Sequence, residues 1–156
     1  MQSAYHVILA EDHVRFREEL KKIIHEIPNI EVVGEVGEGK EFFELLENFK
    51  PDLVVLDISM PNFRAMQATR EIKAKYPDVK VIIMVMDNEN EYLAQAIASG
   101  ADGLVLKQNC AMDLELAIKK INQGGKYFPR SIAEKIPGVD TMMPQRVDGI
   151  TFLPIC

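Results

Sequence analysis

Short apolar runs alternate with longer stretches of mixed polarity along most of this chain. Five such runs occur up to about residue 128, at positions 7–10, 30–36, 53–56, 79–85 and 104–106. Three of them are apolar at successive positions, which is typical of a parallel strand with helices on both faces. The run at 30–36 alternates between apolar and polar residues, and we expect it to form an edge strand.

The stretches between these runs carry apolar residues at the three- and four-residue spacing of a helix with one buried face. Phe42, Leu46 and Phe49 form one such stripe, which we interpret as core rather than as a cofactor site. Three methionines are also assigned to core packing: Met84, Met86 and Met112. Strands that alternate with helices predict an α/β fold, a three-layer sandwich around a five-stranded parallel sheet.

The pattern changes at about Pro129. Four of the eight prolines fall between residues 129 and 156, and little sustained periodicity is left there. We therefore predict one domain over residues 1–128 and a linker or tail over residues 129–156, in which no output domain is recognisable. The length of 156 residues agrees with a single domain, since domains average roughly 150 residues.

Charge and composition exclude several functions. With 18 Lys and Arg against 24 Asp and Glu, the formal net charge is −6, so we expect a polyanion such as DNA to be repelled. No apolar run approaches the roughly 18 residues of a membrane span, and the chain does not begin like a signal peptide. We therefore expect a cytoplasmic protein without membrane contact. The two cysteines, Cys110 and Cys156, are too few for a disulfide framework or a zinc site, and both are predicted to be reduced.

Charged residues stand at the carboxyl ends of three predicted strands, the edge where open α/β sheets place their functional residues. Glu11 and Asp12 follow the first strand, Asp57 ends the third, and Lys107 ends the fifth. Carboxylates from neighbouring strands repel one another unless a hard cation such as Mg²⁺ binds their oxygens. Lys107 could then pair with a phosphoryl oxygen, and Asp57 is a plausible phosphoryl acceptor.

Each of these residues also has a structural interpretation. Glu11 and Asp12 alone could form a solvated turn or the cap of the following helix, and Lys107 alone could be a surface residue. Asp57 is harder to explain in this way, because an unpaired carboxylate directly after four apolar residues is costly to bury. The joint placement at three strand ends favours a functional site. His13, next to the acidic pair, is interpreted as structural.

The chain resembles the receiver domains of two-component response regulators, and most closely those of the NarL/FixJ (LuxR-type) class. The resemblance covers roughly residues 5 to 128. It is carried by the segments 9–13, 32–35, 51–61, 68–72 and 99–107. It implies a flavodoxin-like (CheY-like) fold with strand order 2-1-3-4-5.

The resemblance also implies a function. Asp57 would accept a phosphoryl group from a histidine kinase, a signalling step in which the domain is a phosphoacceptor rather than an enzyme. Glu11, Asp12, Asp57 and the backbone carbonyl of Ser59 would hold Mg²⁺, and Lys107 would contact the phosphoryl oxygens. The domain would relay the signal to a transcriptional output, with homodimerisation as a further expectation and DNA contact only through an output domain.

Two departures from the family pattern, one at residue 85 and one at residues 64–65, bear on switching. Val85 stands where the family usually places a switch hydroxyl, and the lost hydrogen bond would weaken the shift between states by roughly ten- to a hundredfold. Arg64 and Ala65 replace the usual Asp-Gly, and Arg64 is either solvent-facing or near the phosphate site. Tyr92 is a candidate switch aromatic or a packing residue. These departures motivate an alternative, a docking or dimerisation module that does not depend on phosphorylation.

Two other functional classes fit less well. A phosphatase of the haloacid dehalogenase type needs a second aspartate two residues after the first, where this chain has Ser59. A flavodoxin-like electron carrier needs a phosphate-binding loop after the first strand, where Glu11 and Asp12 would repel anionic FMN.

Overall fold

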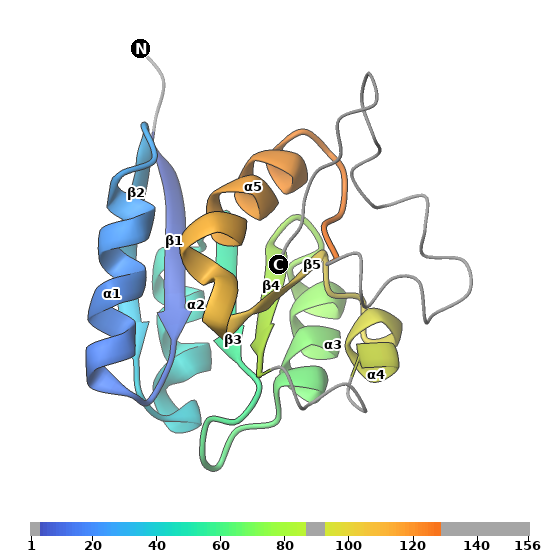
Figure 1. Cartoon of the computed structure of the whole chain (residues 1–156). Helices are drawn as coiled ribbons and strands as arrows, with labels where there is room; N and C mark the ends of the chain where they lie inside the picture. Colours follow the sequence, from blue (N-terminus) through green and yellow to red (C-terminus); the bar gives the residue numbers. More distant parts are fainter. Residues whose placement is uncertain (1–3, 87–92, 129–156) are drawn as a thin grey trace.

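Strands and helices alternate along the chain as the hydrophobic pattern predicts. A computed structural model describes residues 4–86 and 93–128 (Figure 1). The strands are β1 (Tyr5–Ala10), β2 (Ile30–Val36), β3 (Leu53–Asp57), β4 (Lys80–Val85) and β5 (Gly103–Leu106). The helices are α1 (Val14–His25), α2 (Phe42–Phe49), α3 (Ala65–Lys75), α4 (Leu93–Ala98) and α5 (Cys110–Asn122), with short 3₁₀ turns η1 (Gly39–Glu41) and η3 (Lys107–Asn109).

The five strands form one parallel sheet in the order β2-β1-β3-β4-β5. This confirms the expected strand order and the position of β2 at an edge. Helices α1 and α5 cover one face, and α2, α3 and α4 cover the other (Figure 1). The fold is therefore the three-layer sandwich that the sequence predicts.

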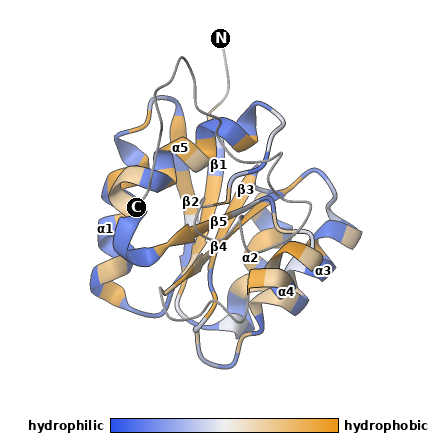
Figure 2. Ribbon diagram, turned by 45° about the vertical axis from the view of Figure 1, so that its right-hand side comes forward, coloured by the Kyte–Doolittle hydropathy of each residue, from blue (hydrophilic) through white to orange (hydrophobic). Residues whose placement is uncertain are grey.

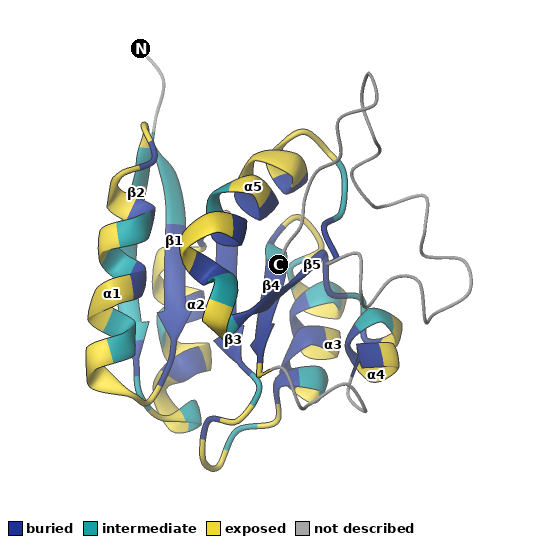
Figure 3. Cartoon of the chain, viewed as in Figure 1, coloured by how far each residue is buried: buried dark blue, intermediate teal, exposed yellow. Residues whose placement is uncertain are grey.

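Two apolar cores separate these layers because successive strand residues point to opposite faces. Leu9 and Val55 lie in the core beneath α1 and α5, whereas Ile8, Val54 and Leu56 lie in the core beneath α2, α3 and α4. In Figure 2 the strands are mostly apolar and the helices are striped, and Figure 3 shows that the buried stripe of each helix faces the sheet. The central strands are thus buried on both faces.

Three apolar side chains that we assigned to packing lie largely outside the core. Phe49 is 47% exposed, Met86 is 44% exposed and Met112 is 70% exposed, whereas Met84 is buried as expected. Phe49 is the last residue of α2, and the spacing of apolar residues does not reveal where a helix ends against its neighbours. The interpretation of these three residues as core is therefore wrong.

The segment that follows α5 pairs with the free edge of β5. The amide of Leu104 donates to the carbonyl of Tyr127 at 2.8 Å, and the amide of Tyr127 donates to the carbonyl of Asp102 at 3.0 Å. Tyr127 packs in the core beneath α1 and α5, and Phe128 is fully buried in the other core. Packing on both faces of the sheet thus fixes the chain as far as residue 128. The predicted tail at 129–156 lies outside the described residues.

No described helix is both long enough and apolar enough to cross a bilayer.

Asp102 is a buried charge that ties three segments together just before β5. Its Oδ2 lies 2.6 Å from Nζ of Lys73 in α3 and accepts a hydrogen bond from the amide of Val81 in β4 at 3.0 Å. Its Oδ1 lies 3.2 Å from Nζ of Lys126. A buried carboxylate is tolerated here because both of its oxygens have donor partners.

We predict that Asp102→Ala lowers the free energy of unfolding by about 3 kcal/mol, because the buried amide of Val81 loses its acceptor and Lys73 loses its partner. Urea denaturation followed by circular dichroism measures the change. The matched control is Glu115→Ala, which removes an exposed pair with Lys119 and should cost less than about 1 kcal/mol. Equal losses in the two variants would contradict a structural role for Asp102.

Candidate functional site

The alternation of side chains along the strands brings Glu11, Asp57 and Lys107 to one side of the sheet. Asp57 ends β3, Glu11 directly follows β1, and Lys107 directly follows β5. Each stands two positions after a strand residue in the core beneath α1 and α5. These core residues are Leu9, Val55 and Val105. Because side chains repeat with a period of two, the three charged residues continue the same rows beyond the core, at the carboxyl edge of the sheet.

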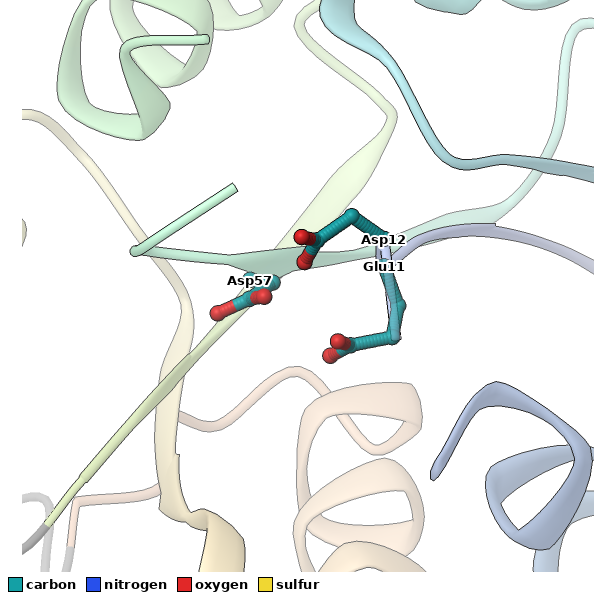
Figure 4. Close-up of side chains that lie close together, drawn as sticks. All are labelled: Glu11, Asp12 and Asp57. Atoms are coloured by element: carbon teal, nitrogen blue, oxygen red, sulfur yellow. The ribbon is translucent and has the colours of Figure 1, made fainter. Parts of the chain in front are cut away.

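Three carboxylates meet at this edge. One oxygen from each of Glu11, Asp12 and Asp57 lies within 4.8 Å of the others. Figure 4 shows the three side chains gathered around a common space. Glu11 and Asp57 are each only 1% exposed, whereas Asp12 is exposed. The predicted acidic cluster is therefore brought together in the structure.

Donors hold one oxygen of Asp57 and leave the other without a partner. Oδ1 lies 2.9 Å from Nζ of Lys107, and it accepts hydrogen bonds from the amide and the hydroxyl of Ser59, both at 3.0 Å. Oδ2 is buried and has no hydrogen-bond partner among the described residues. Burial acts to raise the pKa of Asp57, but Lys107 and Ser59 outweigh it and lower that pKa below its ordinary value. Asp57 is thus an anion with one oxygen that no described donor occupies.

Glu11 is the less well compensated carboxylate. Its Oε2 accepts a hydrogen bond from the amide of His13 at 3.1 Å. Its Oε1 is buried without a hydrogen bond among the described residues and lies 3.5 Å from Nζ of Lys107. Burial and the neighbouring charge of Asp57 raise the pKa of Glu11 to about 7. One ammonium therefore serves two buried carboxylates.

The donor set fits a hard metal ion. Glu11 and Asp57 each direct a buried, unpaired oxygen into the cluster, and carboxylate oxygens are the ligands that such cations prefer. A bound divalent ion would add the positive charge that Lys107 alone does not supply. The cluster opens into a cleft of about 510 Å³ that both carboxylates and Lys107 line. The carbonyl of Ser59, which the sequence adds to this set, stays a prediction.

Two side chains from α1 support the site and were not singled out from the sequence. The ring of Phe16 lies 5.4 Å from Nζ of Lys107, which places an aromatic face over the ammonium. Arg17 donates to the carbonyl of Glu11 at 2.6 Å and pairs with Glu35 of β2 at 2.8 Å, which ties the loop after β1 to the neighbouring strand. Helical spacing marks Phe16 only as a core residue, so the sequence gives no separate signal for its contact.

The residues before α1 have the structural role that we expected for His13. His13 occupies the N-cap of α1, and its Nδ1 accepts a hydrogen bond from the amide of Phe16 at 3.3 Å. Asp12, one residue earlier, is left to face the cluster.

Val85 ends β4 and is buried in the core beneath α2, α3 and α4, in register with Leu106. It offers no hydroxyl to the site. Arg64 is exposed and occupies the N-cap of α3, where its side chain makes no capping hydrogen bond. Tyr92, the candidate switch aromatic, lies outside the described residues.

Comparisons with known proteins agree with the resemblance seen in the sequence. Residues 7–119 match the family described as "Response regulator receiver domain". The chain is 34% identical over 130 residues to the transcriptional regulatory protein DegU of Brevibacillus brevis, with 83% of the chain and 55% of that relative covered. It is 30% identical over 143 residues to the response regulator UvrY of Escherichia coli, with 92% of the chain and 65% of that relative covered. The chain thus spans 55% to 65% of the length of these two relatives.

Solved structures show the same likeness. A LuxR-family two-component response regulator from an Aurantimonas species superposes with a TM-score of 0.79 at 29% identity, over 86% of this chain and 96% of that one. The isolated receiver domain of RcsB from Salmonella enterica serovar Typhimurium, in the presence of the phosphomimetic BeF₃⁻, gives a TM-score of 0.78 at 26% identity, over 85% of this chain and 98% of that one.

The shared ammonium leads to a prediction about stability. In metal-free buffer, Lys107→Met should lower the free energy of unfolding by about 3 kcal/mol, because two buried carboxylates lose the only cation that pairs with them among the described residues. In the double variant Lys107→Met with Asp57→Asn, much of this loss should be recovered, since one of the two charges is gone. A double-mutant cycle in urea measures the coupling. Lys119→Met, on the exposed face of α5, is the control. Additive effects of the two substitutions would refute the electrostatic coupling.

Proposed function

The chain belongs to the family of response regulator receiver domains, and we propose that Asp57 is the residue on which this domain accepts a phosphoryl group. The observation that carries the proposal is the asymmetry of the Asp57 carboxylate. Lys107 and Ser59 keep it ionised through Oδ1, and Oδ2 has no hydrogen-bond partner among the described residues. An ionised carboxylate with free lone pairs is a nucleophile for phosphorus.

The reaction is a transfer of one phosphoryl group. An oxygen of Asp57 forms a bond to phosphorus while the bond between phosphorus and the donor breaks, and the donor leaves with the electron pair of that bond. The product is an acyl phosphate on Asp57. Little covalent assistance is needed in such a step, because its barrier depends mainly on alignment and on neutralisation of the spreading negative charge.

Lys107 supports this step from the fifth strand. Its ammonium lies 2.9 Å from Asp57 and is only 16% exposed, so it can pair with phosphoryl oxygens that arrive at the same carboxylate. Glu11, Asp12 and Asp57, with the carbonyl of Ser59, would hold Mg²⁺. Bound there, Mg²⁺ would supply the charge neutralisation that two buried carboxylates and an incoming phosphoryl group require.

We propose that a histidine kinase donates the phosphoryl group and that this domain passes the signal to a transcriptional output. The relatives are a transcriptional regulatory protein and a response regulator, which supports this proposal. Structures of RcsB include dimers bound to DNA, which supports homodimerisation as a part of the proposal.

The proposed boundary is a receiver domain over residues 1–128 and a linker or tail over residues 129–156. No contact among the described residues favours the alternative of a module that works without phosphorylation.

Phosphorylation is tested with a small donor. In Mg²⁺ and acetyl phosphate, the protein should gain the mass of one phosphoryl group, and removal of Mg²⁺ by a chelator should prevent the gain. Asp57→Asn should abolish it, and Asp12→Asn should slow it because the ion loses a ligand. Intact-protein mass spectrometry gives the readout. Asp52→Asn, which changes an exposed carboxylate just before β3, is the matched control. A full mass gain in the Asp57 variant would contradict the proposal.

A second experiment concerns the strength of switching. Val85→Thr restores a hydroxyl at the end of β4, and a hydrogen bond to a charged group contributes about 1.5–3 kcal/mol. We therefore expect the variant to shift toward the activated state by roughly ten- to a hundredfold more than the parent when beryllofluoride is added. NMR chemical shifts with and without beryllofluoride measure the two populations. Val85→Ala is the control, since it alters packing without adding a donor. An identical response in the parent and the Thr variant would show that the missing hydroxyl at residue 85 does not limit switching.

A further inference from the structure

A second cleft lies beside the acceptor site, along the first turns of α3 and next to α4. It has a volume of about 500 Å³, within the range of small-molecule pockets. Figure 1 shows α3 and α4 adjacent at this end of the sandwich. Five residues give the cleft its polar lining: Ser59, Arg64, Gln67, Arg70 and Gln95. The last four of these carry side-chain hydrogen-bond donors, whereas the hydroxyl of Ser59 already donates to Asp57.

The charge of this cleft is opposite to that of the chain. The whole sequence has a formal net charge of −6, yet both charged residues of the lining are arginines. Arg64 and Arg70 are exposed, and neither pairs with a carboxylate among the described residues. Arg64, Gln67 and Arg70 follow one another at three-residue intervals, which places them in a row along α3. The two guanidinium groups are therefore available to an anionic ligand.

The remaining wall of the cleft is apolar. Ile58, Phe63 and Met66 line it, and all three are half-buried. A bare phosphate ion would fill little of this volume and would gain nothing from these side chains. A ligand that has both a phosphate group and a flat organic part would use the arginines and the apolar wall together.

We propose that this cleft binds a phosphate-bearing small molecule of the size and chemistry of a nucleoside monophosphate. Guanidinium groups bind phosphate oxygens through two parallel hydrogen bonds, which favours a phosphate-bearing ligand over an uncharged polar ligand. The carboxamides of Gln67 and Gln95 offer donors and acceptors to the edge of a base. Gln67 donates one amide hydrogen to Glu71 at 3.3 Å, which leaves its second amide hydrogen and its carbonyl oxygen for a ligand.

The proposed site is separate from the phosphoacceptor. Ser59 lines both clefts, but Arg64 and Arg70 do not line the cleft of Asp57, and Glu11 and Lys107 do not line this one. The family pattern has Asp-Gly where this chain has Arg64 and Ala65, so the arginine that lines the cleft at residue 64 is a departure of this sequence. A ligand held here would contact the loop that follows Asp57 without occupying the acceptor.

Titration with AMP, adenosine and inorganic phosphate tests the proposal. Isothermal calorimetry is carried out in the presence of a chelator, which excludes phosphate bridged by a metal ion at the acidic cluster. We expect AMP to bind more tightly than either adenosine or phosphate, because only AMP uses both parts of the cleft. Arg64→Gln and Arg70→Gln should each weaken AMP binding by about tenfold or more. Arg15→Gln, which changes an exposed arginine of α1, should leave it unchanged.

Several results would overturn the inference. One is that AMP does not bind to the parent protein, and another is that adenosine or phosphate binds as tightly as AMP. A third is that AMP affinity is unchanged in both arginine variants, provided that these variants unfold at the same temperature as the parent. The phosphorylation experiment on Asp57 is independent of all these outcomes.

Discussion

Two buried carboxylates that share one ammonium determine the chemistry of this sheet edge. Taking an ionised carboxylate out of water costs several kcal/mol, and Lys107 can offset that cost fully for only one of the two. It lies 2.9 Å from Asp57 and 3.5 Å from Glu11, so Asp57 is the better compensated partner. This difference agrees with a lowered pKa for Asp57 and a pKa of about 7 for Glu11. The site therefore has an excess of negative charge that favours a cation.

The register of the sheet determines the geometry of the site. Leu9 pairs with Val55, and Asp57 pairs with Met84, which in turn pairs with Val105. These pairs align the rows that end in the charged residues. A slip of one residue between two strands would turn every side chain of the slipped strand to the other face. The apolar core fixes the register, and the register places the carboxylates beside the ammonium.

The sequence predicts this fold and the composition of the site for the same reason: both signals are local. Apolar runs mark the strands, and a charge directly after such a run marks a strand end, as with Asp57. The strand order came from the family resemblance and not from periodicity. The hydroxyl of Ser59 on Oδ1, the ring of Phe16 over Lys107 and the exposure of Met112 depend on tertiary contacts. Residue spacing within one helix or strand does not encode such contacts.

The position of Val85 changes how the acceptor site is connected to the rest of the domain. Val85 is packed in the core beneath α2, α3 and α4, and it has no group that could contact a phosphoryl oxygen through a hydrogen bond. Lys107, in contrast, contacts Asp57 directly and is covalently joined to β5, a strand of only four residues. The opposite end of that strand pairs with Tyr127, which precedes the end of the described chain. Lys107 and β5 therefore connect Asp57 to the last described residues of the chain, through one ion pair and the backbone hydrogen bonds with Tyr127.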